Sequence, residues 1–236
     1  MSIPFSLSPL SIVIATPHER YKHIVESLAQ QLPETRIFYL RSPEELSHVR
    51  LSEINPEYVF FPHWSWRIPE SIYGNYSCVI FHMTDLPYGR GGSPLQNLIV
   101  RGHKSTQVSA LKCIAELDAG PIYLKKPLQL GGTADEILQR ASALILEMIL
   151  EIVRAKPLPL EQEGIPTHFQ RRRPEDGDLG PATTLNNVYD SIRMLDGDGY
   201  PRAFLETRHM KFEFENVDLH DNYLEAKVKI YRKCDD

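Results

Sequence analysis

The sequence predicts an α/β protein with a mainly parallel sheet, followed by a small C-terminal α+β part. Short apolar runs rich in β-branched residues alternate with segments of helical spacing over the first 155 residues, as in parallel βαβ units. From residue 183 onward, a helical segment precedes three alternating segments, which predicts a separate subdomain. A length of 236 residues suits one sizeable domain with a small appendage.

Apolar runs mark the expected strands in the first part of the chain. Residues 10–16 are rich in β-branched side chains and stop at Pro17, as expected of a buried strand. A helix is expected from Glu19 to Leu32, because its apolar residues recur at helical spacing and Pro33 ends the pattern. Further strands are expected at residues 36–40, 58–61 and 78–81.

Two helix starts are predicted from capping signals. At residues 42–45, Ser42 suits the N-cap, Pro43 the first helical position and Glu45 the third. Thr133 and Glu136 form a capping box. The second signal opens a long helix at residues 137–154, whose apolar residues fall on one face.

The remaining segments complete the predicted architecture. Residues 106–114 alternate like a strand, and residues 121–128 are expected to pair back with it as an antiparallel hairpin. A helix is expected at 183–195, and strands at 203–206, 210–214 and 224–230. Residues 156–173 are Pro-rich and irregular, as linkers are. The predicted domains are therefore a catalytic domain at 1–155, a linker at 156–173 and a small subdomain at 174–236.

Composition narrows the classes of function. The net charge is −5 and no long basic block occurs, which disfavours a nucleic-acid partner. Cys78, Cys113 and Cys234 lack metal-ligand spacing, so we expect no metal and reduced thiols in a cytoplasmic protein. The first ten residues lack the features of a signal peptide, and no apolar run reaches about 18 residues, so we expect no membrane span.

The candidate active site is a His at the end of the fourth expected strand, followed by a Pro/Gly-rich loop. His82 opens this loop at residues 81–94, and a second turn carries Asp118. Ligands of parallel sheets gather at the carboxyl ends of the strands. A His titrates near neutral pH, and an Asp beside it can orient the ring and accept a proton. Together they suit acyl transfer to an amine.

The same residues carry a family resemblance. His82, Thr84-Asp85-Leu86-Pro87, Arg90-Gly91, Pro94 and Gln96 resemble the H-x-S-L-L-P-x-x-R-G-x-x-P-x-Q loop of formyltransferases that use 10-formyltetrahydrofolate. Leu117-Asp118-Ala119-Gly120 resembles the second motif of this family, L-D-T-G. Both motifs stand in the family's order and at about its separation. The resemblance covers roughly residues 10–155 and implies a Rossmann-like formyltransferase core.

The resemblance also implies roles for particular residues. His82 would stabilise the oxyanion or act as general acid/base, and Asp118 would orient it and accept the proton of the amine. Trp66, Thr84 and Gln107 are the candidates for substrate binding. The candidates for folate binding come from the loop after the third strand, from the Gly-rich loop and from the second motif; they are Trp64, Arg67, Ile68, Leu86, Pro87, Gly89, Arg90 and Leu117.

One position departs from the family pattern. The family has Asn-x-His, in which the Asn amide donates to the oxyanion, whereas this chain has Ile80 two residues before His82. Thr84, Gln107 or a backbone amide would have to supply the hydrogen bond. The alternative is a folate-binding relative without catalytic activity.

The resemblance points to two classes of acceptor. Resemblance within the family favours sugar N-formyltransferases that act on nucleotide-linked dideoxyamino sugars, such as the enzyme of the pseudaminic acid pathway. The loop also resembles the formylation domains of peptide synthetases, so an aminoacyl acceptor on a carrier or on tRNA is the alternative. The expected partners are folate and a nucleotide-linked amino sugar, with no nucleic acid or membrane, and with a possible homodimer.

Overall fold

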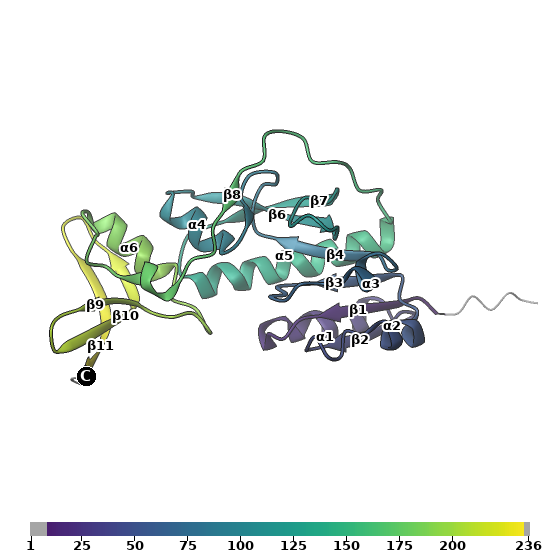
Figure 1. Cartoon of the computed structure of the whole chain (residues 1–236), viewed down its shortest axis with the longest axis horizontal. Coiled ribbons are helices and arrows are strands. Elements are labelled where there is room, and N and C mark those ends of the chain that lie inside the picture. Colours follow the sequence, from purple (N-terminus) through teal and green to yellow (C-terminus); the bar gives the residue numbers. More distant parts are fainter. Residues whose placement is uncertain (1–8, 234–236) are drawn as a thin grey trace, which may run out of the picture. The chain divides into compact units, whose positions relative to one another are not determined.

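A computed structural model describes residues 9–233 of the chain. The prediction of no signal peptide falls largely before these residues, and Cys234 lies after them. Figure 1 shows the helices and strands of the chain. The chain divides into two compact units, each made of three segments. The first comprises the residues up to His82, Val108–Lys126 and Ser142–Gly164; the second comprises Met83–Gln107, Pro127–Ala141 and the residues from Ile165 onward. The domain boundaries predicted at residues 155 and 173 stay a prediction.

The central sheet has six strands in the order β2-β1-β3-β4-β6-β7. The first four in this order pair in parallel, and β4 pairs antiparallel with β6. The mainly parallel sheet is therefore confirmed, and two strands begin and end where the sequence predicts. The strands are β1 (Ser11–Ala15), β2 (Arg36–Leu40), β3 (Tyr58–Phe61), β4 (Cys78–His82), β6 (Ser105–Lys112) and β7 (Ile122–Gln129).

Alternate residues of the strands pack on opposite faces of this sheet. One face carries a buried cluster that includes Val13, Phe61 and Cys78, together with Leu51 and Ile72 from two short helices. Ile12 and Ile14 are fully buried on the other face. The helices here are η1 (Glu19–Tyr21), α1 (Lys22–Gln31), α2 (His48–Ile54), α3 (Glu70–Tyr73) and α5 (Ala134–Ala155), the last of which continues from the second unit.

The predicted helix start at residues 42–45 is wrong. These residues form a turn, in which the Leu46 amide donates to the Pro43 carbonyl at 3.2 Å. The helix α2 begins at His48, because Ser47 is its N-cap and accepts a hydrogen bond from the Arg50 amide. The predicted capping box of α5 is confirmed: Thr133 N donates to Glu136 Oε2 at 2.8 Å, and Glu136 N donates to Thr133 Oγ1 at 3.3 Å.

The second unit combines two short α-helices, a two-stranded ribbon and a three-stranded antiparallel sheet. The predicted linker is not irregular throughout, because it contains β8 (His168–Phe169), which pairs with β5 (Arg90–Gly91). Thr184 caps the predicted helix. The other elements are α4 (Pro94–Val100), η2 (Pro174–Gly177), α6 (Leu185–Arg193), β9 (Ala203–Glu206), β10 (Met210–Leu219) and β11 (Leu224–Arg232).

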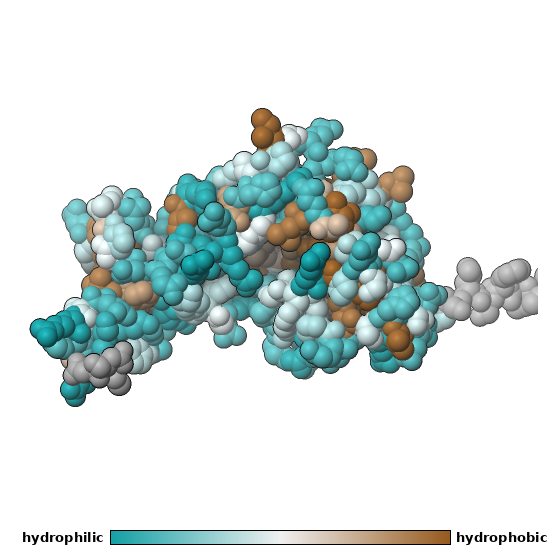
Figure 2. Space-filling view, in the orientation of Figure 1, coloured by the Kyte–Doolittle hydropathy of each residue, from teal (hydrophilic) through white to brown (hydrophobic). Residues whose placement is uncertain are grey.

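The surface is mixed in hydropathy. The space-filling view shows a largely hydrophilic face with apolar side chains between the polar ones (Figure 2). Within residues 9–233, no helix is long and apolar enough to cross a membrane.

Candidate active site

His82 is the last residue of β4, at the carboxyl end of a parallel strand. It is 7% exposed and lies opposite Ser109 of β6, which is fully buried. Alternation along the strand places His82 on the same face as Ile80 and Cys78. This face packs against the buried cluster, where Ile80 is partly buried. The imidazole therefore lies at the strand edge where ligands of parallel sheets bind.

Asp118 lies in the turn between β6 and β7 and is 8% exposed. Its Oδ2 is 3.6 Å from His82 Nδ1, so the structure brings together the two residues predicted to be catalytic. This distance is longer than a hydrogen bond, and the contacts of catalytic pairs often shorten when substrate binds. A carboxylate at this distance can orient the ring and stabilise its charged form.

The turn that carries Asp118 has an unusual backbone. Asp118 has a φ of 52°, in the left-handed region that few non-glycine residues occupy. Gly120 is required two residues later, because a Cβ there would collide with the carbonyl oxygen of Lys112. Gln162, which the sequence analysis did not single out, donates from Nε2 to the carbonyls of Asp118 at 2.8 Å and Gly120 at 2.9 Å.

The thiol near Asp118 is not suited to nucleophilic catalysis. Burial raises the pKa of Cys113 to about 11, and the Asp118 carboxylate adds to this shift. Burial also raises the pKa of Cys78, next to Cys113. With these raised pKa values, both cysteines stay protonated at neutral pH. The nucleophilic form of cysteine is the thiolate, so neither thiol is activated. Within residues 9–233, no group of three His, Cys, Asp or Glu side chains could hold a metal ion.

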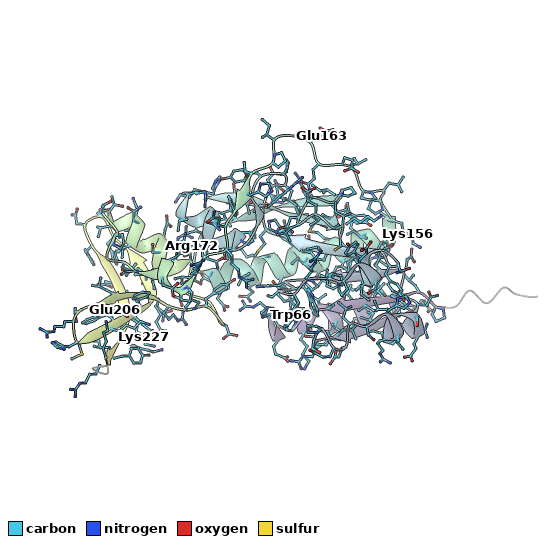
Figure 3. All side chains as sticks on the ribbon, viewed as in Figure 1. Trp66, Lys156, Glu163, Arg172, Glu206 and Lys227 are labelled. Carbon is cyan, nitrogen blue, oxygen red and sulfur yellow. The ribbon has the colours of Figure 1, made fainter. Side chains whose placement is uncertain are left out.

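The loop after β3 holds four of the predicted ligand-binding residues. Ile68 is buried in the core cluster, so its side chain is used for packing. Trp64 packs edge-on against Phe61 and Trp66, with ring centroids 5.6 and 4.9 Å apart. Its buried indole N–H has no hydrogen-bond acceptor among the described residues. Trp66, which is labelled in Figure 3, is an exposed residue, with 45% of its surface accessible, and Arg67 is also exposed.

A pair of histidines at the ends of β1 and β3 was missed by the sequence analysis. The rings of His18 and His63 lie 4.3 Å apart, and Tyr21 Oη is 3.5 Å from His63 Nδ1. Burial lowers the pKa of His63 to about 3, and the charges of His18 and Arg20 add to this shift. His63 is therefore neutral at physiological pH. No local signal in the sequence indicates this pair, because 45 residues separate its members.

In the second unit, the predicted folate loop is held by the segment after residue 165. The Arg90 amide donates to the Thr167 carbonyl at 2.9 Å, and the Gly92 amide donates to the Phe169 carbonyl at 3.2 Å. The Gly89 amide donates to Thr167 Oγ1 at 2.7 Å. We call residues 167–171 the strap. The strap is thus hydrogen-bonded along the Gly-rich loop.

The strap packs closely against the glycines of this loop. A Cβ at Gly89 would lie 2.7 Å from the Phe169 ring, and a Cβ at Gly92 would lie 2.6 Å from the Arg171 Cβ. A Cβ at Gly91 would collide with the Phe169 carbonyl oxygen. The glycines therefore make room for the strap.

The remaining predicted residues differ in exposure. Thr84 and Leu86 are buried, and the Thr84 hydroxyl donates to the Gly89 carbonyl at 3.4 Å. Arg90 is also buried, whereas Leu117, next to Asp118, is 67% exposed. Pro87 and Gln107 are partly buried. Their roles in binding folate or substrate stay predictions.

Known proteins share this fold over most of the chain. A likely sugar N-formyltransferase from Mycobacterium tuberculosis is 18% identical, with a TM-score of 0.69 over 84% of this chain and 93% of that one. HypX from Aquifex aeolicus, solved with tetrahydrofolic acid, is 16% identical, with a TM-score of 0.73 over 89% of this chain and 38% of that one. At these identities the likeness establishes the formyltransferase type of fold.

A closer relative establishes the family. A methionyl-tRNA formyltransferase from Clostridium thermocellum is 44% identical, with a TM-score of 0.92, over 95% of this chain and all of that one. The family model for the C-terminal domain of methionyl-tRNA formyltransferase matches residues 174–231. The chain therefore belongs to the formyltransferase family.

Relatives with curated sequences are longer than this chain. The methionyl-tRNA formyltransferase of Wolinella succinogenes is 26% identical over 181 residues, which are 72% of this chain and 57% of that one. The chain spans about half the length of the curated relatives it matches.

Proposed function

We propose that the protein is an N-formyltransferase that moves a formyl group from 10-formyltetrahydrofolate to the amine of an aminoacyl acceptor. The observation that carries this proposal is the buried His82–Asp118 pair at the carboxyl end of β4. Membership of the formyltransferase family supports the type of reaction. Formyl transfer between nitrogens needs charge stabilisation and proton transfer, which one His and one Asp can provide.

The folate co-substrate supplies an activated formyl carbon bound to a nitrogen. In the proposed reaction, the acceptor amine forms a bond to this carbon, and the bond from the carbon to the folate nitrogen breaks. Asp118 receives the proton that the amine loses. His82 stabilises the negative charge that develops on the formyl oxygen and delivers a proton to the leaving nitrogen. The acceptor thus loses one proton and the folate nitrogen gains one.

The loop after β3 has groups that suit a flat heterocycle. The buried indole N–H of Trp64 lacks an acceptor among residues 9–233, and a ring carbonyl or nitrogen of a pterin could supply one. The exposed face of Trp66 offers a surface for stacking. The Ile68 side chain is occupied in the core, so this residue would contribute its backbone groups to the pocket. These residues would hold the folate in this unit.

The relatives favour an aminoacyl acceptor over a sugar. The curated relatives at 22–27% identity and the solved structure at 44% identity carry the name methionyl-tRNA formyltransferase. The sugar enzymes are fold neighbours at 15–18% identity. The nucleotide-linked amino sugar therefore becomes the second candidate, and nothing among the relatives favours the pseudaminic acid pathway in particular. An aminoacyl-tRNA acceptor also reverses the expectation of no nucleic-acid partner, despite the net charge of −5.

A panel of acceptors tests this proposal. Release of tetrahydrofolate from 10-formyltetrahydrofolate would be followed with methionyl-tRNA, an aminoacyl thioester on a carrier protein and a nucleotide-linked 4-amino sugar. We expect release that depends on the aminoacyl acceptor. Release with the sugar alone would favour the second candidate, and folate binding without release from any acceptor would indicate a non-catalytic relative. A homodimer and a cytoplasmic location stay predictions.

A further inference from the structure

Asp118 is held in a backbone conformation that needs external support. A left-handed residue other than glycine costs about 1–2 kcal/mol, and such conformations persist where the surroundings fix them. Asp118 has a φ of 52°, and it is also the proposed proton acceptor. Whatever fixes this turn therefore also sets the position of the carboxylate.

One side chain brackets the turn. The Nε2 of Gln162 donates to the Asp118 carbonyl at 2.8 Å and to the Gly120 carbonyl at 2.9 Å. One amide group thus ties together the residues on both sides of Ala119. A glutamine can do this because its two N–H donors diverge from one nitrogen; a carboxylate of the same size has no donor to offer.

The position of Gln162 is itself fixed by the backbone. Two residues earlier, Leu160 exchanges two hydrogen bonds with Ile122 at the start of β7: Ile122 N donates to Leu160 O at 2.7 Å, and Leu160 N donates to Ile122 O at 2.9 Å. The segment that follows α5 is thereby attached to the strand that leaves the Asp118 turn. All these residues belong to the first compact unit, together with His82.

We infer that Gln162 is a positioning residue, which fixes the Asp118 turn and so holds the carboxylate beside His82, where it can accept the proton of the amine. This inference rests on the proposed formyl transfer. The His82–Asp118 distance is 3.6 Å, and displacing a reacting group by about 1 Å can cost on the order of a hundredfold in rate. We call the two Gln162 hydrogen bonds the clamp. Loss of the clamp should therefore slow the chemical step and leave the binding of either substrate unchanged.

Three variants test the inference. Gln162→Ala removes the clamp, and Gln162→Glu keeps the size but places a carboxylate against two carbonyls. Glu163→Ala is the matched control, because Glu163 is the exposed next residue on the same segment (Figure 3). We expect both Gln162 variants to lower kcat by about tenfold to a hundredfold while KM for donor and acceptor changes by less than about threefold. Thermal unfolding would establish that each variant is folded.

A double-mutant cycle separates positioning from general stability. Because Gln162 acts through Asp118, Gln162→Ala should cause no further loss of kcat in an Asp118→Ala background. A further loss of kcat when Gln162→Ala is added to Asp118→Ala would overturn the inference. Wild-type turnover in the single variant Gln162→Ala would overturn it as well.

A second readout does not depend on turnover. At fixed pH, the NMR signals of the His82 ring protons should shift in Gln162→Ala and stay unchanged in Glu163→Ala. Unchanged ring signals in Gln162→Ala would overturn the positioning role, whether or not turnover is found. Inactivity of the wild-type protein with every acceptor would instead contradict the proposed function, while shifted ring signals would still support the clamp.

Discussion

His82 Nδ1 and Asp118 Oδ2 face each other at 3.6 Å, and both side chains are more than nine-tenths buried. His82 is the last residue of β4, whereas Asp118 lies in the turn between β6 and β7. Burial removes competing water, so the interaction between a carboxylate and a charged imidazole is stronger here than at the surface.

Removing either member of this pair should abolish most of the activity. We expect His82→Ala and Asp118→Ala each to lower turnover by about a hundredfold or more, the effect typical of acid/base groups. His220→Ala, at an exposed histidine of the C-terminal hairpin, is the control and should keep wild-type turnover. Steady-state kinetics would measure the effect, and near-normal turnover in either variant would remove that residue from the mechanism.

Restoring the family Asn should not raise the activity. Ile80 is opposite Phe61 and Leu111 in the sheet and packs on the core cluster. Ile80→Asn would bury an amide, at a cost of about 1–3 kcal/mol in unfolding free energy. Ile80→Val is the control, with a cost of about 0.5–1.5 kcal/mol. Denaturant unfolding and turnover would both be measured. A large gain in turnover in Ile80→Asn would mean that the native site lacks a good oxyanion donor.

A side chain at Gly91 should disrupt the strap. Gly91 has a φ of 106°, and a Cβ there would collide with the Phe169 carbonyl oxygen. We expect Gly91→Ala to destabilise the protein by about 1–3 kcal/mol, as expected for backbone strain, and to weaken folate binding measured by calorimetry. The control is Gly131→Ala, where a Cβ would meet nothing within 4 Å. Equal stability of the two variants would contradict the role of the glycines.

Acid should destabilise the fold through His63. Its pKa falls from 6.5 to about 3 in the folded protein, so between these values the unfolded chain binds more protons. Stability is thus fully present above about pH 6.5 and is lost as the pH falls toward 3; at pH 5 this loss is about 2 kcal/mol. His63→Asn removes the titrating group and retains a residue that tolerates the left-handed backbone found here. Denaturant unfolding should therefore show a smaller loss between pH 7 and pH 5 in the variant, and an equal loss would refute the assignment.

Local signals were sufficient to predict much of the fold. The strands at 36–40 and 58–61 and the capping box of α5 follow from patterns within a few residues. The signal at Ser42 was misleading because Ser47, five residues later, offers a competing N-cap, and a turn closes between Pro43 and Leu46. Both the strand periodicity and the two motifs contributed to the prediction that His82 and Asp118 belong to one site.

The supports of the site depend on pairings between distant segments. The strap joins residues 78 positions apart, such as Gly89 and Thr167, and β8 is only two residues long. Gln162 lies 44 positions from Asp118 in a segment whose prolines indicate only irregular structure. Neither a propensity nor a periodicity encodes such contacts, so the hydrogen bonds of Gln162 and of the strap could not be predicted from the sequence.

The central claim is best tested by following the formyl group itself. Labelled 10-formyltetrahydrofolate would be incubated with methionyl-tRNA and the wild-type protein, and with the Asp118→Ala variant as the control. The account predicts that the label appears on the aminoacyl amine with the wild-type protein and is lowered by about a hundredfold in the variant. Label that stays on folate with the wild-type protein, or transfer that does not require Asp118, would contradict it.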